Sequence, residues 1–412
     1  MRPLPDVQAE ILDAVGVLAA TTVGLRDAYG LALVEDVVAG HDLPPFANSA
    51  MDGYAVRAAD VAEAPVDLPV VEEVAAGAVP TKEVTEGTAV KIMTGAPLPA
   101  GADTIVKVED TEPGAGAVRV LAGAEKGTSV RPAGGDVAAG TTVLTAGERL
   151  GSAHLGVLAA LGVAWPPVRR RPTVAIMSTG DEVVAPETAT LGPGKIRDAN
   201  RFLLRGMLHE LGAVVVDFGI VADDPDDLRR VLEHAAQEAD VVVTSGGVSM
   251  GEYDVVKQVF AGVGDVAFHR VAMQPAKPLG FGRIAGKPFF GLPGNPVSVV
   301  VAFEQFLRPA LLAMMGCSKI FRSRIPGRLV EPVATDPDKA VFLRVVTLDV
   351  GTDGWSARLS GGQSSNVLSA LAAADAFAVI PVGTAGVAAG DRVELEMFRW
   401  PEGRTRKEVL GG

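Results

Sequence analysis

The chain of 412 residues is 48% hydrophobic and 21% charged, with a formal net charge of −13 at pH 7. This composition predicts a soluble globular protein of several domains. The acidic balance argues against nucleic acid as a partner, because phosphate-backbone binding needs a basic face. The single cysteine, Cys317, excludes an intrachain disulfide and any multi-cysteine metal site.

Two features of the sequence bear on location. No apolar run approaches the roughly 20 residues that span a bilayer, and the first residues, MRPLPD, lack the cationic start and apolar stretch of a signal peptide. We therefore expect a cytoplasmic protein with no membrane contact. The one dense basic run, Arg169 to Arg171, is expected to be a solvated linker ahead of a strand.

The N-terminal residues have apolar positions three and four apart, which predicts helices over 7–18 and 25–33, and a third helix is expected over 147–161. Residues 1–43 and 141–171 would then form a discontinuous helical linker domain. Between them, residues 44–140 are rich in Gly, Pro, Val and Thr in short runs, which predicts a small mainly-β module.

From residue 172 to 318 short apolar runs alternate with helical patterns over 201–211, 225–238 and 297–315. This alternation is typical of a doubly wound parallel sheet in an α/β domain. From residue 319 short strands and turns return, which predicts a C-terminal β-barrel-like domain over 319–412. The predicted fold class is therefore an α/β and β multidomain protein.

Three glycine-rich turns each follow a short apolar run in the α/β segment: Thr179 to Glu182, Ser245 to Ser249, and Gly291 to Ser298. The carboxyl ends of parallel strands line one crevice, so these turns should converge on a common ligand. Glycine lets the backbone approach that ligand, and the N–H groups of a following helix attract anions. The sequence therefore predicts a pocket for a phosphate-bearing small molecule.

Carboxylates stand at glycine or proline turns in four places: Asp52, Asp136, Asp181 with Glu182, and Glu252 with Asp254. Taken singly, each is most often a turn acceptor or a helix cap. If several meet at an anion-binding crevice, however, they would repel the ligand unless a hard cation lay between. Oxygen ligands of this type suit Mg²⁺, so we expect a magnesium-assisted site.

Standard nucleotide-binding motifs are missing. The segment Gly246 to Gly251 is not G-x-G-x-x-G, and no Walker-type Gly-Lys-Ser/Thr occurs. A nicotinamide dehydrogenase and a P-loop enzyme therefore have no support.

Six segments in order resemble the motif series of the MoeA/gephyrin family, the molybdopterin molybdenumtransferases: Ser49–Ala55, Met93–Pro97, Gly101–Asp103, Ser178–Glu182, Ser245–Ser249 and Leu292–Ser298. The match runs over almost the whole chain. The resemblance implies an elongated four-domain protomer, usually a homodimer. It also implies an enzyme that uses Mg²⁺ to insert molybdenum from molybdate into adenylylated molybdopterin, releasing AMP and molybdenum cofactor. A molybdopterin adenylyltransferase would be its partner.

The resemblance also implies roles for individual residues. By motif, Asp52, Glu182 and Asp254 would be catalytic, and Asp52, Asp136 and Glu182 would bind metal. The turns of the α/β segment would cradle the pterin phosphate, the nucleotide and molybdate. The implied substrate-binding residues are Thr94, Thr179, Gly180, Asp181, Ser245, Gly246, Gly247, Val248, Ser249, Lys277, Pro293, Gly294, Asn295, Pro296 and Ser298.

One stretch departs from the family pattern. Where the family usually has a sequence close to Lys-Pro-Gly-Lys-Pro, this chain has Gln274-Pro275-Ala276-Lys277-Pro278, so that a neutral amide replaces one cation. Two interpretations stay open: a weaker affinity for molybdate, or a different arrangement of charge around it.

Two other functions stay open as well. A related molybdopterin adenylyltransferase would need only the α/β domain, whereas the β module with Asp52 and Thr94 favours insertion. A gephyrin-like scaffold would instead display a groove for a partner peptide. Because Asp52 and Glu182 belong to different modules, we also expect a two-fold dimer to bring them together from different chains.

Overall fold

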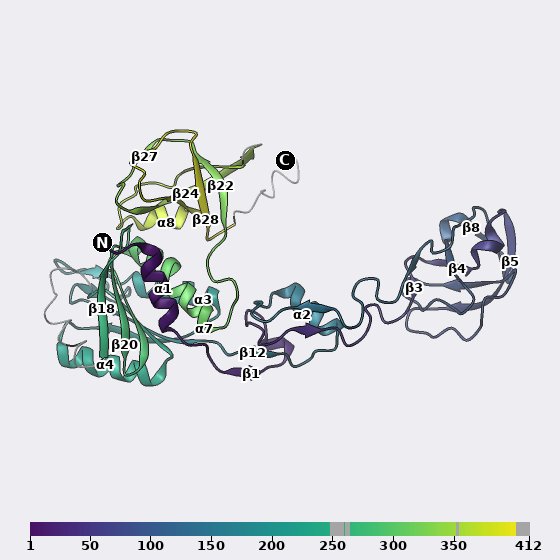
Figure 1. The fold of residues 1–412 in the computed structure, drawn as a ribbon, viewed down its shortest axis with the longest axis horizontal. Coiled ribbons are helices and arrows are strands. Elements are labelled where there is room, and N and C mark those ends of the chain that lie inside the picture. Colours follow the sequence, from purple (N-terminus) through teal and green to yellow (C-terminus); the bar gives the residue numbers. More distant parts are fainter. Residues whose placement is uncertain (248–258, 260–263, 352–353, 401–412) are drawn as a thin grey trace.

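The chain forms an elongated molecule (Figure 1), in a computed structural model that describes residues 1–247, 259, 264–351 and 354–400. The α/β part and the C-terminal β part lie together at one end. The mainly-β module lies at the other end, and a narrow linker region joins the two. This arrangement confirms the predicted class of an α/β and β multidomain protein.

The α/β part is built on a six-stranded sheet of order β16-β13-β17-β21-β20-β18. The first four strands in that order pair in parallel, and β20 pairs antiparallel with both β21 and β18. Its elements are β13 (Thr173–Thr179), β14 (Val183–Val184), β15 (Ile196–Arg197), α3 (Asn200–Leu211), β16 (Val214–Val221), α4 (Pro225–Glu238), β17 (Val241–Ser245), β18 (Gly264–Arg270), β19 (Met273–Gln274), β20 (Pro278–Ile284), β21 (Lys287–Leu292), α6 (Pro296–Ala302), η4 (Phe303–Leu307) and α7 (Arg308–Met314).

Helices cover both faces of this sheet because its central strands are apolar on both sides. Along β13, Val174 and Ile176 belong to the core under α3 and α6, whereas Ala175 and Met177 belong to the core under α4. Continuous apolar runs of this kind are typical of doubly wound parallel sheets. The predicted helix over 225–238 is α4, where Pro225 occupies the first turn and the Asp224 side chain caps the N-terminus.

The long C-terminal helical stretch of this domain is interrupted by proline. Pro309 has no N–H to donate to the carbonyl of Gln305, and the helix widens into a π-turn over Phe303–Leu307. The freed Gln305 carbonyl instead accepts a hydrogen bond of 3.1 Å from Nε2 of Gln8. Helix α1 (Leu4–Ala14) thereby docks on the α/β part, with Val7 and Ile11 fully buried.

Pro296–Met314 is also the one helical stretch, among the residues that the structure describes, with the length and hydropathy to cross a bilayer. Its mean hydropathy is 1.5, and 89% of the tested window is buried inside the molecule. A core helix buried in this way meets the same criteria.

The linker region is less helical than expected. Its elements are β1 (Ala20–Thr22), η1 (Leu25–Asp27), β2 (Val37–Val38), β11 (Thr142–Leu144), α2 (Ser152–Ala160) and β12 (Pro167–Arg169). The prediction of a helix over 25–33 was wrong, since only three residues form a 3₁₀ turn and Ala32 and Leu33 make isolated bridges to Arg149 and Val168. Their apolar spacing reflects packing of short extended segments beneath α2.

The basic run is not a solvated linker, which corrects that expectation. Arg170 forms a two-pronged ion pair with Asp240, with both N···O distances 2.6 Å. Arg169 donates to the carbonyl of Leu18, and Arg171 donates to those of Gly212 and Tyr29. These arginines therefore fix the linker region to the α/β part.

The mainly-β module holds a six-stranded sheet of order β7-β4-β6-β5-β9-β8. Its two faces bury separate small cores, one around Leu68 and Val118 and the other around Val90 and Ile105. The elements are β3 (Asn48–Ser49), β4 (Gly53–Val56), η2 (Ala58–Val61), β5 (Val66–Val74), β6 (Ala89–Ile92), β7 (Thr104–Lys107), η3 (Val108–Asp110), β8 (Thr111–Pro113), β9 (Ala117–Val120) and β10 (Val130–Arg131).

The C-terminal part is a sheet that closes on itself, because β24 pairs with β25 at one side and with β26 at the other. The elements are β22 (Arg324–Leu329), β23 (Val333–Ala334), β24 (Ala340–Gly351), β25 (Gly354–Leu359), α8 (Leu368–Ala373), β26 (Ala376–Ile380), β27 (Gly386–Val387) and β28 (Arg392–Met397). The short β19 of the α/β part pairs in parallel with β24 and joins the two domains.

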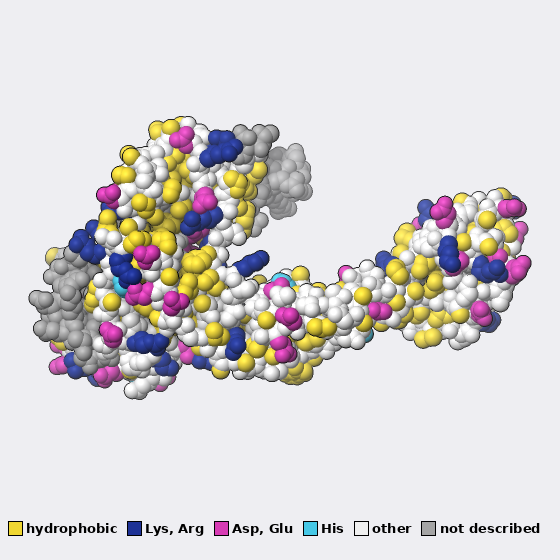
Figure 2. All heavy atoms as spheres, in the orientation of Figure 1, with side chains coloured by type: hydrophobic (Ala, Val, Ile, Leu, Met, Phe, Trp, Pro, Cys, Tyr) yellow, Lys and Arg dark blue, Asp and Glu magenta, His cyan; other side chains and the backbone are white. Residues whose placement is uncertain are grey.

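Charged side chains of both signs are interspersed over the face drawn in Figure 2, and the described basic residues there gather in no continuous patch. This distribution accords with the formal net charge of −13.

Candidate functional site

The three glycine-rich turns lie next to one another at the carboxyl edge of the sheet, as predicted. Ser178 at the end of β13 is in register with Ser245 at the end of β17, which is in register with Leu292 at the end of β21. Consequently the turns that begin at Thr179, Gly246 and Pro293 leave the sheet side by side. A ligand at this edge would face all three.

The floor of this edge requires glycine. Gly246 has φ +98°, and a Cβ there would lie 2.6 Å from the carbonyl oxygen of Thr179. Gly247 has φ +69°, and its Cβ would lie 3.0 Å from Oγ1 of Thr179. That hydroxyl is buried and has no hydrogen-bond partner among the described residues. The two glycines thus keep the backbone close to an unpaired polar group.

An acidic rim lies beside the glycine turns. Asp181 and Asp223 exchange hydrogen bonds, each carboxylate accepting from the other's N–H at 3.2 Å. Glu182 folds back over Gly180, where a Cβ would lie 2.5 Å from a Glu182 carboxylate oxygen. Burial, with a smaller contribution from the Asp181 and Glu182 charges, raises the pKa of Asp223. The rim therefore carries closely spaced negative charge.

Asp223 was not predicted from the sequence as a site residue. The available signal was its place two residues after the apolar strand β16, whose last residue, Val221, is in register with Thr179 at the end of β13. A carboxylate at that position falls at the same sheet edge as the three turns.

A cavity of about 710 Å³ lies where the C-terminal part meets the α/β part. The α/β part contributes predicted residues, namely Lys277, Pro293, Gly294, Asn295 and Ser298, together with the departing residues Gln274 and Ala276. The C-terminal part contributes Lys339, Gln363, Ser364 and Ser365, which the sequence reasoning did not assign to the site. No local sequence pattern assigns these residues to the cavity, which exists only where the two parts meet.

A second cavity of about 380 Å³ shares Gln274, Pro275 and Gln363 with the first, and Arg344 lines it. Arg344 is 1% exposed, and its Nη2 donates to the carbonyls of Gly362 and Ser364. Its Nε has no partner among the described residues, and burial lowers the pKa of the guanidinium to about 10. A buried cation with an unused donor suits an anionic ligand.

The predicted residues of the β module form a separate group. Oδ1 of Asp52 accepts hydrogen bonds of 2.7 Å from both the N–H and the hydroxyl of Thr94. Both hydrogen bonds lower the pKa of Asp52, and the bond from the hydroxyl has the larger effect. Asp136 is exposed in the loop before β11, and its N–H donates to the carbonyl of Leu43. This module lies at the far end of the molecule from the α/β part (Figure 1).

The protomer does not bring the predicted metal ligands Asp52, Asp136 and Glu182 together. Over residues 1–247, 259, 264–351 and 354–400, no three His, Cys, Asp or Glu side chains are grouped so as to hold a metal ion. The predicted residues Val248, Ser249 and Asp254 lie outside the described residues.

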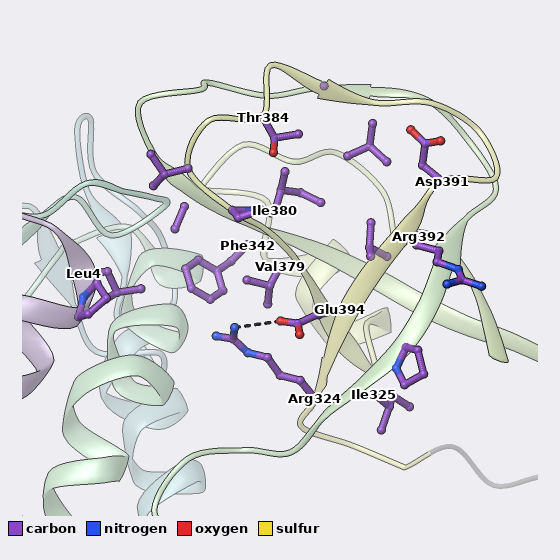
Figure 3. Close-up of a pocket in the computed structure, with 18 of the residues that line it drawn as sticks. Leu4, Arg324, Ile325, Phe342, Val379, Ile380, Thr384, Asp391, Arg392 and Glu394 are labelled. Carbon is purple, nitrogen blue, oxygen red and sulfur yellow. Dashed lines mark hydrogen bonds and ion pairs between the residues drawn. The ribbon is translucent and has the colours of Figure 1, made fainter. Parts of the chain in front are cut away.

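A larger groove of about 930 Å³ separates α1 from the C-terminal sheet (Figure 3). Leu4 lies on one side and Val379 and Ile380 on the other, and Arg324 pairs with Glu394 at 3.2 Å along its edge. Among the residues that the structure describes, none of those predicted for the site lines this groove.

The strand-end turns and the interdomain cavity define the class of this molecule: a multidomain α/β protein with a site shaped for an anionic small molecule. Three family models match the chain: "MoeA N-terminal region (domain I and II)" over residues 2–162, "Probable molybdopterin binding domain" over 175–313, and "MoeA C-terminal region (domain IV)" over 326–398.

Individual relatives agree with these matches. The chain is 41% identical over 405 residues to molybdopterin molybdenumtransferase 2 of Mycobacterium tuberculosis, covering 96% of this chain and 99% of that protein. It is 37% identical over 380 residues to the molybdopterin molybdenumtransferase of a Nostoc species, covering 90% and 87%. A crystal structure of the molybdopterin biosynthesis MoeA protein from Pyrococcus horikoshii superposes with a TM-score of 0.83 at 30% identity, covering 97% and 100%. The chain belongs to the MoeA family of molybdopterin molybdenumtransferases.

Proposed function

We propose that this protein is a transferase that inserts molybdenum from molybdate into adenylylated molybdopterin, giving molybdenum cofactor and AMP. The proposal rests on one observation: residues of the third turn, Pro293 to Ser298, line the same interdomain cavity as Lys277. The turns after β13 and β17 supply backbone groups for a phosphate, and the cavity supplies cations and hydroxyls for an oxyanion.

The chemical task is electrostatic. Molybdate is a dianion and the dithiolene of the pterin is electron-rich, so that their approach needs charge neutralisation and positioning more than proton transfer. Lys277 lines this cavity and makes no hydrogen bond or ion pair with the described residues, so its ammonium group is available to an anion there. The Ser298 hydroxyl and the Asn295 amide line the same cavity and would orient the ligand.

Magnesium suits the acidic rim by the chemistry of its oxygen atoms, but the described residues of one protomer do not group three such side chains around an ion, so further ligands must come from a second chain or the substrate. Asp181, Glu182 and Asp223 offer the oxygen donors that Mg²⁺ prefers, and the raised pKa of Asp223 reports burial beside two like charges. When bound, the ion would neutralise the rim and the phosphate oxygens of the substrate. We assign Glu182 and, from a second chain, Asp52 as its protein ligands, with Asp136 nearby.

The protein would act in the cytoplasm as a homodimer, with a molybdopterin adenylyltransferase as the partner that supplies its substrate. The groove beside α1 would suit the alternative scaffold function, because its lining is largely apolar and lies apart from the substrate residues.

Restoration of nitrate reductase activity in a strain that lacks the insertase tests the proposal. We expect the wild-type chain to restore activity, Lys277→Ala to lose most of it, and Val382→Ser in the groove to retain it. Loss of activity in Val382→Ser alone, with both proteins folded and equally abundant, would show that the groove takes part in cofactor synthesis. Failure of the wild-type chain would contradict the proposal.

A further inference from the structure

A small polar cavity of about 210 Å³ lies apart from the substrate residues, on the side of α3 and α7 that the linker region joins (Figure 1). Three arginines line it: Arg149 from the linker region, Arg308 from α7, and Arg322 from the connection between α7 and β22. Two carboxylates accompany them, Glu210 of α3 and Glu304 of η4. None of these residues lines the interdomain cavity that contains Lys277. Basic side chains from three separate segments therefore meet at a second place in the molecule.

Glu304, the buried carboxylate of this cavity, is engaged mainly by Arg322. Its two oxygens accept hydrogen bonds of 2.9 Å from Nε and Nη2 of Arg322. Nε of Arg308 lies 3.7 Å from the nearer Glu304 oxygen, beyond hydrogen-bond distance, and Nη1 of Arg308 donates to the carbonyl of Ile320 at 3.1 Å. The carboxylate thus matches the charge of Arg322 and leaves that of Arg308 only partly matched.

Arg308 is a buried cation with an incomplete counter-charge. Its side chain is 13% exposed. Burial, then the charge of Arg322, and to a smaller extent that of Arg149, lower its pKa to about 10 against the opposing effect of Glu304. Because a poorly solvated cation is costly unless it is paired, an anion from solution would be stabilised beside it.

Arg149 adds a second cation without a carboxylate partner. Its Nε donates to the carbonyl of Gly30 at 3.0 Å and its Nη2 to that of Leu211 at 2.6 Å, and it forms no ion pair with the described residues. Glu210 is exposed at the rim and also forms no ion pair with the part of the chain that the structure describes, although its charge acts on Arg322. The cavity therefore keeps an excess of positive charge.

We propose that this cavity binds a small inorganic oxyanion, phosphate or sulfate, between Arg149 and Arg308, and that the anion joins the linker region to the α/β part. Planar guanidinium groups match the oxygens of such anions in geometry and charge. A single water needs only about 10–15 Å³ of such a volume, so the cavity has room for a tetrahedral ion. The site is independent of the proposed reaction, since it involves neither molybdopterin nor molybdate.

Calorimetric titration of the full-length protein with inorganic phosphate, and in parallel with sulfate, tests the inference at constant ionic strength. We expect saturable binding that persists in Lys277→Ala, because that variant changes only the interdomain cavity. Arg149→Gln should weaken phosphate binding by about tenfold or more, as loss of a charge-assisted hydrogen bond does, and Arg149→Lys should retain part of the affinity. Arg229→Gln, an exposed arginine of α4 outside this cavity, is the matched control and should bind like the wild type.

Glu210→Gln gives a change of opposite sign. Removing a negative charge from the rim should strengthen phosphate binding several-fold, since a like charge no longer opposes the anion. This variant leaves the three arginines and Glu304 in place, so it keeps the inference testable even if Arg149→Gln fails to fold.

Thermal unfolding measures whether the anion stabilises the fold. A ligand that binds only the folded chain raises the unfolding temperature by mass action. The difference between phosphate and chloride buffers should therefore be large in the wild type and Glu210→Gln and small in Arg149→Gln, whatever the stability of each variant in chloride.

Location is tested by soaking crystals of the wild type and of Arg149→Gln in selenate. We expect an anomalous peak between Arg149 and Arg308 in the wild type alone. Wild-type affinity in Arg149→Gln, weaker binding in Glu210→Gln, or loss of all phosphate binding in Lys277→Ala would overturn the inference. A selenate peak in a protein without measurable phosphate affinity would mean an adventitious ion only, and would overturn it as well.

Discussion

Glu182 is the carboxylate that we expect to matter most for the reaction, because it lies at the rim of the strand-end turns and folds over Gly180. Glu182→Ala should lower the rate of molybdenum insertion by about 10²-fold or more, as removal of a preorganised electrostatic group does. Binding of molybdopterin should survive, and chelation of Mg²⁺ in the wild type should have the same effect as the substitution.

Glu233→Ala on the exposed side of α4 is the matched control and should leave insertion unchanged. Rates are measured in single-turnover assays, with pterin binding followed by fluorescence. Near wild-type turnover of a correctly folded Glu182→Ala protein would remove this residue from the mechanism.

At the residue scale, the site residues that directly follow strands are predictable from the sequence, whereas those that another domain contributes are not. Thr179, Gly246 and Pro293 were predictable because each ends an apolar run of a parallel sheet. Lys339 and Gln363 were not, because only the docking of the C-terminal part places them in the cavity. A local sequence pattern does not indicate which distant segments come into contact in the fold.

At the scale of elements, the turn after β17 depends on the absence of a side chain. Gly246→Ala combines a φ of +98° with a Cβ placed 2.6 Å from the Thr179 carbonyl oxygen. We expect a loss of about 2 kcal/mol or more in the free energy of unfolding, together with weaker pterin binding.

Gly206→Ala is the matched control, since a Cβ at this helical position in α3 meets nothing within 4 Å. It should be neutral or stabilise by roughly 0.5–1 kcal/mol, because alanine favours helices. Urea unfolding of both variants makes the comparison, and equal stabilities would show that the turn adapts to a side chain.

The π-turn of the long helix holds a buried carboxylate, Glu304, whose contribution to the free energy of unfolding can be tested. Glu304 is 4% exposed and accepts two hydrogen bonds of 2.9 Å from Arg322, with Nε of Arg308 at 3.7 Å. Burial, then the charge of Arg322, lowers the pKa of Arg308 to about 10 against the opposing effect of Glu304. Glu304→Gln would leave two poorly solvated guanidinium groups without their counter-charge, which costs about 3–5 kcal/mol.

The control is Glu394→Gln, whose ion pair with Arg324 is largely exposed on the Glu394 side, at 63%. Exposed pairs contribute about 0–1 kcal/mol, so this variant should unfold close to the wild type. Thermal and urea unfolding measure the stability of both variants. A Glu304→Gln protein as stable as Glu394→Gln would show that the buried pair adds nothing to stability.

Elements were predicted best where a helix or strand carries its own signals. Pro225 and the Asp224 cap mark the start of α4, and its apolar spacing marks the rest. The prediction of a helix over 25–33 was wrong because Leu31 and Leu33 are buried in extended backbone. This backbone pairs with residues far along the chain, near Arg149 and Val168. A spacing of buried leucines does not by itself distinguish these two cases.

On the scale of the whole molecule, the elongated shape separates residues to which the family resemblance assigns one site. Asp52 with Thr94 lies in the module at one end, and Glu182 lies at the sheet edge of the α/β part at the other (Figure 1). In a two-fold dimer each contact occurs twice, so the β module of each chain would meet the α/β edge of its partner. Each site would then take Asp52 from one chain and Glu182 from the other.

Mixing two inactive variants under conditions of subunit exchange tests this arrangement. In a heterodimer of Asp52→Ala with Glu182→Ala, one composite site would carry both substitutions and the other neither. Activity should therefore return to about half of the wild-type value per heterodimer if the sites act independently. If both residues came from the same chain, every site would keep one defect and the mixture would stay inactive. Persistent inactivity, with heterodimers demonstrated by native mass spectrometry, would rule out the shared site.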